Sequence, residues 1–204
     1  LFCSATADQR GIFANVATRD GGGLYVSSNS TVFANCVGPV ERYDIHGNTA
    51  GRDGGGIHAS GTIAFVNIIG ILLRNNHAGT TVTGHGGGAS VTAGGILYFR
   101  GVDVFDPAPP ACPSAADCAA IEGNVAGSPA LPGFGGGVYV GAGGRATVEI
   151  TALRGNSADQ GGAAMASGAG AQLTIGSALL TGHASEGAVL AAESAATLTV
   201  QSST

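Results

Sequence analysis

The stretch IHGNTAGRDGGGIHA at residues 45–59 contains every element of a unit that recurs along the chain. An aliphatic residue stands three positions before an Asn, and an Ala stands two positions after it. A run of glycines then leads into a short segment whose apolar residues occupy alternate positions. Such alternation is typical of a β-strand, whose side chains point to opposite faces in turn. The unit is therefore predicted to be a strand that follows a tight glycine turn.

The Asn-x-Ala motif marks five copies of this unit, and His183 stands in a degenerate sixth. The five Asn residues are Asn15, Asn48, Asn76, Asn124 and Asn156. The shortest copies have fewer than thirty residues, which is room for three short strands and three turns. A helical repeat of this length would need a 3.6-residue period and few glycines. The sequence predicts an all-β fold, a right-handed, single-stranded parallel β-helix of about six coils, forming one domain over residues 1–204.

Two strands of each coil can be placed from the apolar alternation. The first strands are expected at 24–26, 57–59, 89–91, 138–140, 164–166 and 189–191. The second strands are expected at 31–33, 62–65, 96–98, 147–150, 173–175 and 198–200. A third short strand is expected to hold the aliphatic residue before each Asn.

The repeated Asn has a structural interpretation. Neighbouring strands lie about 4.8 Å apart, so equivalent side chains of successive coils form a column. Each amide can donate to the coil on one side and accept from the coil on the other. Asn also tolerates the left-handed backbone that a sharp corner needs. We expect the five Asn residues to form a structural ladder.

The composition argues against several classes of protein. Glycine accounts for 37 of 204 residues, only 10% of residues are charged, and the net charge is −5. The basic residues are all Arg and are scattered, so the basic stripe of a nucleic-acid-binding protein is missing. No apolar run reaches the roughly 18 residues of a membrane helix. No signal peptide is visible, and the chain opens inside a strand-like pattern, so we interpret it as a mature chain or a segment of a longer protein.

The combination of aliphatic-x-x-Asn with a following Gly-Gly-[Gly/Ala]-aliphatic resembles the repeats of bacterial polymorphic outer-membrane proteins. It also resembles, more broadly, pectate-lyase-like β-helix repeat proteins. The resemblance extends from Ile12 to Val200, with Ile or Leu where the first family often has Phe. Proteins of that family are surface-displayed adhesin passengers that a C-terminal β-barrel translocator exports. The resemblance therefore implies a bacterial cell-surface adhesin.

The four cysteines form two candidate pairs. Cys3 and Cys36 each lie twelve residues before a repeat Asn, so they are expected to stack within the Cα range of a disulfide, about 4.4–6.8 Å. Cys112 and Cys118 bracket a loop in the Pro-rich insertion at 101–120, which a local disulfide would close. Two disulfides indicate an extracellular or cell-surface location. With no Cys-x-x-Cys and five scattered His residues, neither a metal nor a cofactor is expected.

Candidate catalytic residues are few. Gly84-His85-Gly86 superficially resembles the Gly-His-Gly of polygalacturonases, but the other motifs of that family are missing, so His85 is interpreted as a corner residue. Asp103 and Asp106 flank the insertion and are interpreted as solvated loop residues, although a glycosidase needs paired carboxylates. No catalytic residue is assigned, and a polysaccharide lyase or hydrolase with its site near the insertion is kept as an alternative.

Charged pairs precede the first two glycine runs. Arg19-Asp20 and Arg52-Asp53 occupy equivalent positions, so they are expected to stack and neutralise one another across the coils. The simpler interpretation is a surface ion-pair lattice of modest stability. A calcium site is the alternative.

The outward middle position of the first strand is a candidate binding stripe. Its members are Tyr25, His58, Tyr139, Met165 and Leu190, with Ser90 in the third coil. Aromatic and apolar residues on a surface with few charges are typical of contacts with a glycan, a host or cell-surface protein, or a second copy. The alternative is that a neighbouring segment covers the stripe. We expect a non-catalytic extracellular module, adhesin-like or structural, with a self-associating envelope or filament subunit joined through open helix ends as a further alternative.

Overall fold

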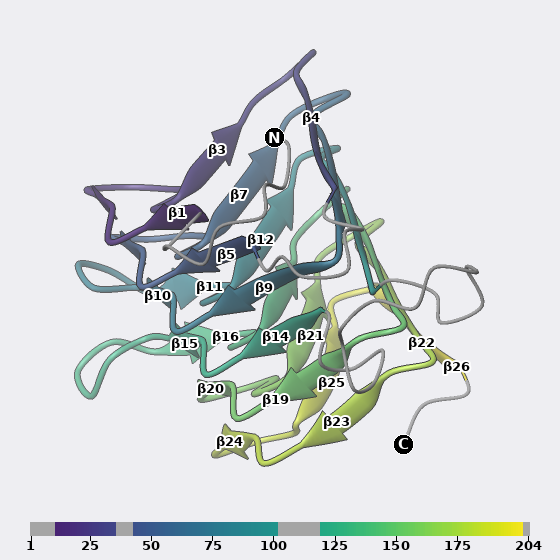
Figure 1. The fold of residues 1–204 in the computed structure, drawn as a ribbon. Coiled ribbons are helices and arrows are strands. Elements are labelled where there is room, and N and C mark those ends of the chain that lie inside the picture. Colours follow the sequence, from purple (N-terminus) through teal and green to yellow (C-terminus); the bar gives the residue numbers. More distant parts are fainter. Residues whose placement is uncertain (1–10, 36–42, 102–118, 202–204) are drawn as a thin grey trace.

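The structure, a computed structural model, describes residues 11–35, 43–101 and 119–201. These residues form no helix, and their strands run parallel in stacked sheets (Figure 1). The chain winds from the N-terminal coil at the top of Figure 1 to the C-terminal coil at the bottom. This arrangement confirms the predicted parallel β-helix, with six coils within the described ranges. No described segment is an apolar helix long enough to cross a membrane.

Four six-stranded sheets, here called A to D, line the column. Sheet A contains β1 (Gly11–Phe13), β5 (Tyr43–His46), β9 (Ile71–Arg74), β14 (Ala120–Glu122), β19 (Ala152–Arg154) and β23 (Leu179–Thr181). Sheet B contains β2 (Val16–Ala17), β6 (Thr49–Ala50), β10 (His77–Ala78), β15 (Val125–Ala126), β20 (Ser157–Ala158) and β24 (Ala184–Ser185). Sheet C contains β3 (Leu24–Val26), β7 (Ile57–Ser60), β12 (Ala89–Thr92), β17 (Val138–Val140), β21 (Ala164–Ser167) and β25 (Leu190–Glu193). Sheet D contains β4 (Thr31–Asn35), β8 (Phe65–Ile69), β13 (Ile96–Arg100), β18 (Arg145–Glu149), β22 (Gln172–Gly176) and β26 (Thr197–Gln201).

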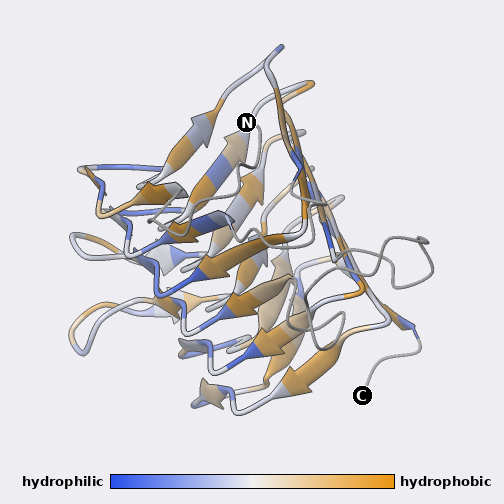
Figure 2. Cartoon of the chain, viewed as in Figure 1, coloured by the Kyte–Doolittle hydropathy of each residue, from blue (hydrophilic) through white to orange (hydrophobic). Residues whose placement is uncertain are grey.

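The core is a set of inward columns that run through all coils. In sheet A the column joins the aliphatic residues that precede each repeat Asn, which are Ile12, Ile45, Leu73, Ile121, Leu153 and Leu180. Sheet D supplies Val66, Leu97 and the fully buried Phe99. Figure 2 shows hydrophobic colour along the strands of the stack and hydrophilic colour at many of its corners. Because side chains alternate, a slip of one residue would turn such a column out of the core, so the register is strongly specified.

Each coil contributes one strand to each of these four sheets, whereas three strands per coil were expected. The chain turns a corner at the repeat Asn, and this corner divides the expected third strand between sheets A and B. The left-handed residue of the corner is the one before the Asn and not the Asn itself, which corrects the expectation from sequence. Its φ lies between 52° and 66° in all six coils, at Ala14, Gly47, Asn75, Gly123, Gly155 and Gly182.

Two of the expected second strands are misplaced. In the second coil the strand is β8, whereas Thr62 and Ile63 form the preceding turn, with a φ of 62° at Ile63. In the fourth coil the strand is β18, and Ile150 follows it with a φ of 49°. In both coils an apolar alternation continues into the turn, so the pattern alone does not locate the strand end.

The repeat Asn side chains lie in one column at the corner between sheets A and B. Asn48, Asn76, Asn124 and Asn156 are fully buried. Each Nδ2 donates to the Oδ1 of the Asn in the next coil at 2.9–3.0 Å, from Asn15 as far as Asn156. From Asn48 onward, each Nδ2 also donates to a backbone carbonyl of the previous coil, at 2.8–2.9 Å.

The same Oδ1 atoms also bind backbone. Each one accepts the N–H of the Asn in the previous coil at 3.0–3.1 Å. For Asn48, Asn76 and Asn124, both hydrogens of the carboxamide and its oxygen are therefore fully used. Buried polar groups are stable only when bonded in this way.

The glycine run permits close approach of successive coils. A Cβ added at Gly87 would overlap the carbonyl group of Val125 and lie 2.6 Å from the carbonyl oxygen of Gly136, in the next coil. A side chain at this position would force the coils apart, which explains why the run is glycine.

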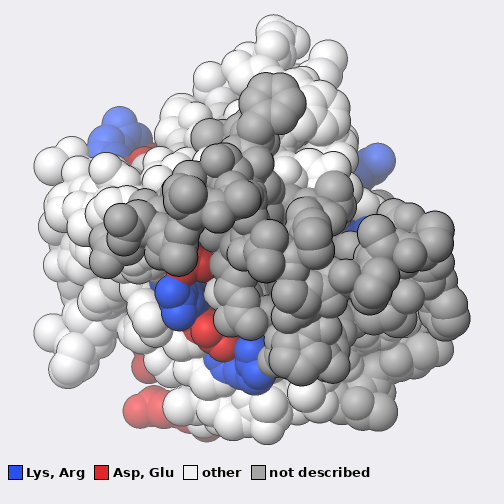
Figure 3. All heavy atoms as spheres, in the orientation of Figure 1, with Lys and Arg blue, Asp and Glu red and all other residues white. Residues whose placement is uncertain are grey.

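Charged side chains on the outward face of sheet A form ion pairs. Arg74 pairs with Asp44, and Arg154 lies 3.2 Å from Glu122. Figure 3 shows blue and red atoms alternating along this face, among described atoms that are otherwise mostly white. These partly exposed pairs contribute modestly to stability.

Candidate ligand-binding site

A second column of side chains lies at the residue immediately before each of the first five glycine runs. We call it the pre-glycine column, and it consists of Asp20, Asp53, His85, Phe134 and Gln160. Each member precedes a glycine with a φ of 63–68°. Parallel bridges join Asp53 to His85 and Phe134 to Gln160, so the members stack from coil to coil. In the third and fourth coils these residues belong to two additional strands, β11 (Gly84–His85) and β16 (Gly133–Phe134).

The pre-glycine column faces the outward column of sheet C, which contains most of the expected binding stripe. Tyr25, His58, Ser90, Tyr139 and Met165 are in register there. They do not form a continuous exposed surface. Tyr25 is 55% exposed, whereas His58 and Met165 are only 3% and 2% exposed.

The left-handed glycines explain this burial. A Cβ added at Gly54 would lie 2.9 Å from the Cβ of His58, and one at Gly161 would lie 2.6 Å from the Cβ of Met165. The turn thus folds back over the strand and covers its outward residue. The expectation of an exposed stripe is wrong at His58 and Met165, which are buried and have the glycine turn packed against them.

Leu190 is not a member of this column. It pairs with Ala164, and Ala191 pairs with Met165, so the expected register of the last coil was one residue off. Leu190 points inward and packs against the core. The last glycine run has only one glycine, Gly187, which left its register poorly marked in the sequence.

A network of ion pairs links the first three coils through the pre-glycine column. Arg52 donates to both carboxylate oxygens of Asp20, from Nε at 2.8 Å and from Nη2 at 2.6 Å. Its Nε also lies 3.4 Å from Asp53. The other Asp53 oxygen lies 2.7 Å from Nδ1 of His85. The expected stacking of the two Arg-Asp pairs is thus observed, but it is unequal, because Arg52 neutralises both acids while Arg19 forms no ion pair among the described residues.

The network shifts the protonation of its members. Burial would raise the pKa of Asp20, but the hydrogen bond from Arg52 and the charges of His58 and Arg52 outweigh it, so this pKa lies below its usual value. The hydrogen bond to Asp20 raises the pKa of Arg52. Burial lowers the pKa of His58, and the nearby charges of Asp20 and Asp53 oppose this only in part. His58 is therefore neutral at pH 7.

Aromatic rings lie on both sides of these charges. The rings of Tyr25 and His58 are stacked, with centroids 5.5 Å apart and planes 16° apart. Further along the stack, His85 packs against Phe134 at 5.5 Å and against Tyr139 at 4.5 Å. His85, interpreted from the sequence as a simple corner residue, is thus the link between the charged and the aromatic parts of the site.

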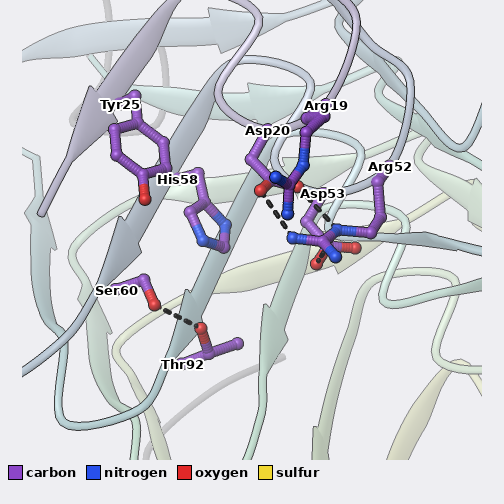
Figure 4. A pocket seen from close by; sticks show the side chains of 8 residues that line it. All are labelled: Arg19, Asp20, Tyr25, Arg52, Asp53, His58, Ser60 and Thr92. Carbon is purple, nitrogen blue, oxygen red and sulfur yellow. Dashed lines mark hydrogen bonds and ion pairs between the residues drawn. The ribbon is translucent and has the colours of Figure 1, made fainter.

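A cavity of about 360 Å³ opens between the two columns. It is lined by Arg19, Asp20, Tyr25, Arg52, Asp53, His58, Ser60 and Thr92 (Figure 4). Thr92 donates to the Ser60 hydroxyl at 3.1 Å. Nδ1 of His58 is buried and has no hydrogen-bond partner among the residues that the structure describes. The cavity combines an exposed aromatic ring, two hydroxyl groups and two guanidinium groups, which is a set of groups able to bind a polar, hydroxylated molecule.

The charge arrangement is unfavourable for acid catalysis. A glycoside hydrolase needs one carboxyl group whose pKa is raised so that it can donate a proton. Here Arg52 contacts both acids, and the pKa of Asp20 is shifted downward. Within the described ranges, no three His, Cys, Asp or Glu side chains are grouped so that they could hold a metal ion.

Several expectations fall outside the described residues. They concern Cys3, Cys36, Cys112 and Cys118, and the insertion with Asp103 and Asp106.

The fold and the site define a class, an all-β solenoid with a lateral polar cavity beside an exposed tyrosine. Comparison with known proteins adds no family to this description. No family model, no curated protein and no solved structure matches the chain.

Proposed function

We propose that this chain is a non-catalytic, extracellular β-helix module that binds a carbohydrate in the cavity beside Tyr25, in the manner of an adhesin. The observation that carries the proposal is the ring of Tyr25, which is 55% exposed at the wall of a polar cavity and stacked on the buried His58. A ring held in place in this way offers a flat apolar face to a sugar ring at little entropic cost.

The other groups of the cavity supply what a sugar needs around its edge. Ser60 and Thr92 provide hydroxyl groups on one side, and the guanidinium groups of Arg19 and Arg52 provide donors on the other. The volume of about 360 Å³ is near the lower end of small-molecule sites, which are roughly 300–1,000 Å³. It suits one or two sugar units.

Export is supported by the sequence. Four cysteines in two candidate pairs are typical of oxidising compartments. The low charge content and the strand stacking suit a surface module that presents its sides to a partner.

The proposal is tested by screening the protein against an array of oligosaccharides and measuring the hits by calorimetry. Tyr25→Ala is expected to weaken binding about tenfold, which corresponds to about 1.4 kcal/mol. Phe33→Ala is the matched control, because Phe33 lies in the same coil, is 65% exposed and contacts the aromatic Phe65 of the next coil, but it lies in sheet D. Equal losses in the two variants, or no binding to any oligosaccharide, would contradict the proposal.

A further inference from the structure

The corner between sheets C and D differs in the first coil from the same corner elsewhere. In the third to sixth coils the corner is rich in Gly and Ala, at 93–95, 141–144, 168–171 and 194–196. In the first coil it reads Ser27-Ser28-Asn29-Ser30, and Thr31 follows. Asn29-Ser30-Thr31 is an Asn-x-Thr sequon, the acceptor pattern for N-linked glycans. Of the nine Asn residues in the sequence, Asn29 is the only one in such a pattern.

The backbone of this corner is held in place while its side chains remain outside. The N–H of Asn29 donates to the carbonyl of Thr62 at 3.0 Å, and the φ of Asn29 is 59°. Asn29 and Thr31 are both exposed. Neither the carboxamide of Asn29 nor the hydroxyl of Thr31 makes a hydrogen bond among the described residues. Both groups are therefore available to solvent.

The ladder Asn residues differ from Asn29, because their side-chain amides already make hydrogen bonds. N-glycosylation replaces one hydrogen of an Asn Nδ2 with a sugar carbon. The Nδ2 of Asn76 uses both of its hydrogens, one for Asn124 at 3.0 Å and one for the carbonyl of Ile45 at 2.8 Å. A glycan on a ladder Asn would remove one of these bonds and place a bulky group between coils.

The sequence keeps sequons away from the ladder. The second residue after each ladder Asn is Ala, and Ala50, Ala78 and Ala126 are buried. In the sixth coil this position is Ser185, which would complete a sequon, but His183 there replaces the Asn. A sequon thus occurs where the fold can accommodate a glycan and is missing wherever the fold cannot.

We propose that Asn29 is an acceptor for an N-linked oligosaccharide. In the transfer step, Nδ2 of Asn29 attacks the anomeric carbon of a sugar that is linked to a polyprenyl pyrophosphate. The new N–C bond forms as the C–O bond to the pyrophosphate breaks, the pyrophosphate leaves with the electron pair, and one amide proton passes to a base of the transferase. This inference rests on the export that belongs to the proposed function, and it is independent of carbohydrate binding at Tyr25.

A glycan at Asn29 would lie at the first described coil of the stack. Among the described strands, β3 is paired only with β7 and β4 only with β8, so each presents one unpaired edge. Such edges are templates for association with other chains. A hydrated oligosaccharide at the corner between β3 and β4 would hinder that association.

The test is secretion of the chain from a cultured eukaryotic cell line, followed by peptide mass spectrometry. Trypsin cuts at Arg19 and Arg42, so a single peptide carries the site. The glycan is expected on Asn29 in the wild type and in Thr31→Ser, and on neither Asn29→Gln nor Thr31→Ala. Thr31→Ala is the sharper variant, because it keeps the acceptor nitrogen and removes only the hydroxyl that the transferase recognises.

A secreted wild-type peptide with mostly unmodified Asn29, while a sequon-bearing protein from the same cells is glycosylated, would overturn the inference. So would equal modification of the wild type and Thr31→Ala. If Asn29 is modified but no oligosaccharide binds, the proposed ligand-binding function fails and the acceptor site stands.

Discussion

The Asn ladder and the pre-glycine column are built alike and behave differently. Both contribute one residue to each of the first five coils at a corner next to sheet B, and both stack from coil to coil. The ladder repeats one residue type in the first five coils and makes all of its bonds within itself and to the backbone. The pre-glycine column changes from acids to rings to an amide, and part of it lines a cavity.

The difference teaches how a repeat protein separates architecture from function. A position that keeps the same residue from coil to coil has the same structural role throughout, which is to make hydrogen bonds to the next coil. A position whose residue varies is not needed to connect the coils. At the pre-glycine column, the left-handed glycine that follows already determines the turn. Specific chemistry can therefore occupy the pre-glycine column without disturbing the stack.

The largest effect is expected from breaking the ladder in the middle. Asn76→Ala removes the acceptor for the N–H and Nδ2 of Asn48, and the donor to Asn124 and to the carbonyl of Ile45. Since these groups are buried, the loss in the free energy of unfolding is expected to be about 3–5 kcal/mol. Urea denaturation followed by circular dichroism measures it.

The end of the ladder provides the control. Asn15 is exposed and donates to Asn48 at 2.9 Å, so Asn15→Ala is expected to lose only about 1 kcal/mol. Similar losses for Asn15→Ala and Asn76→Ala would mean that the ladder is not the source of stability that its geometry indicates.

A smaller effect is expected in the pre-glycine column. Arg52→Ala removes a two-point hydrogen bond to Asp20, whose side chain is only 9% exposed, and should destabilise the fold by about 1–2 kcal/mol. Arg154→Ala removes an ion pair to Glu122 in which both side chains are about one-third exposed, and should change stability by about 0.5 kcal/mol or less. Urea denaturation of both variants measures the two losses in the free energy of unfolding. A larger loss for Arg154→Ala than for Arg52→Ala would contradict the prediction.

The smallest effect is a pH dependence at the cavity. Burial lowers the pKa of His58, so the folded state binds its proton less readily than the unfolded state, in which the pKa is about 6.5. The stability that neutral His58 contributes is therefore fully present above about pH 6.5. It is lost as the pH falls from about 6.5 to the lower pKa that His58 has in the folded state. Asp20 contributes separately, below about pH 4, because its pKa is also lowered.

His58→Phe keeps a ring under Tyr25 and removes the titration. Urea midpoints measured between about pH 5 and 8 are expected to fall less steeply toward acid in this variant than in the wild type. His183 shifts in the same direction, because burial lowers its pKa, so part of the slope remains. Parallel curves for wild type and variant would show that the pKa of His58 is the same in the folded and unfolded states, and would contradict the prediction.

The sequence predicts the ladder because identity between coils is visible in one chain. Asn48 and Asn76 can be aligned without knowing the fold, and stacking then follows from strand spacing. The cavity could not be found in this way. His85 and Asp53 differ in type, and only the folding back of the turn brings them opposite His58. The only sequence feature that Asp53 and His85 share is that each directly precedes a glycine run.

The ladder also has a direction. From Asn48 to Asn124, each carboxamide donates one N–H to the Asn of the next coil and points its C=O toward the previous coil, while its second N–H donates to a backbone carbonyl of the previous coil. Aligned amide dipoles add, as they do along an α-helix, and hydrogen-bonded chains polarise one another. The column thus carries a small electric moment, negative at the first coil and positive at the sixth. His183 stands at that positive end, where burial already lowers its pKa, and a neutral imidazole is the form that such a field favours.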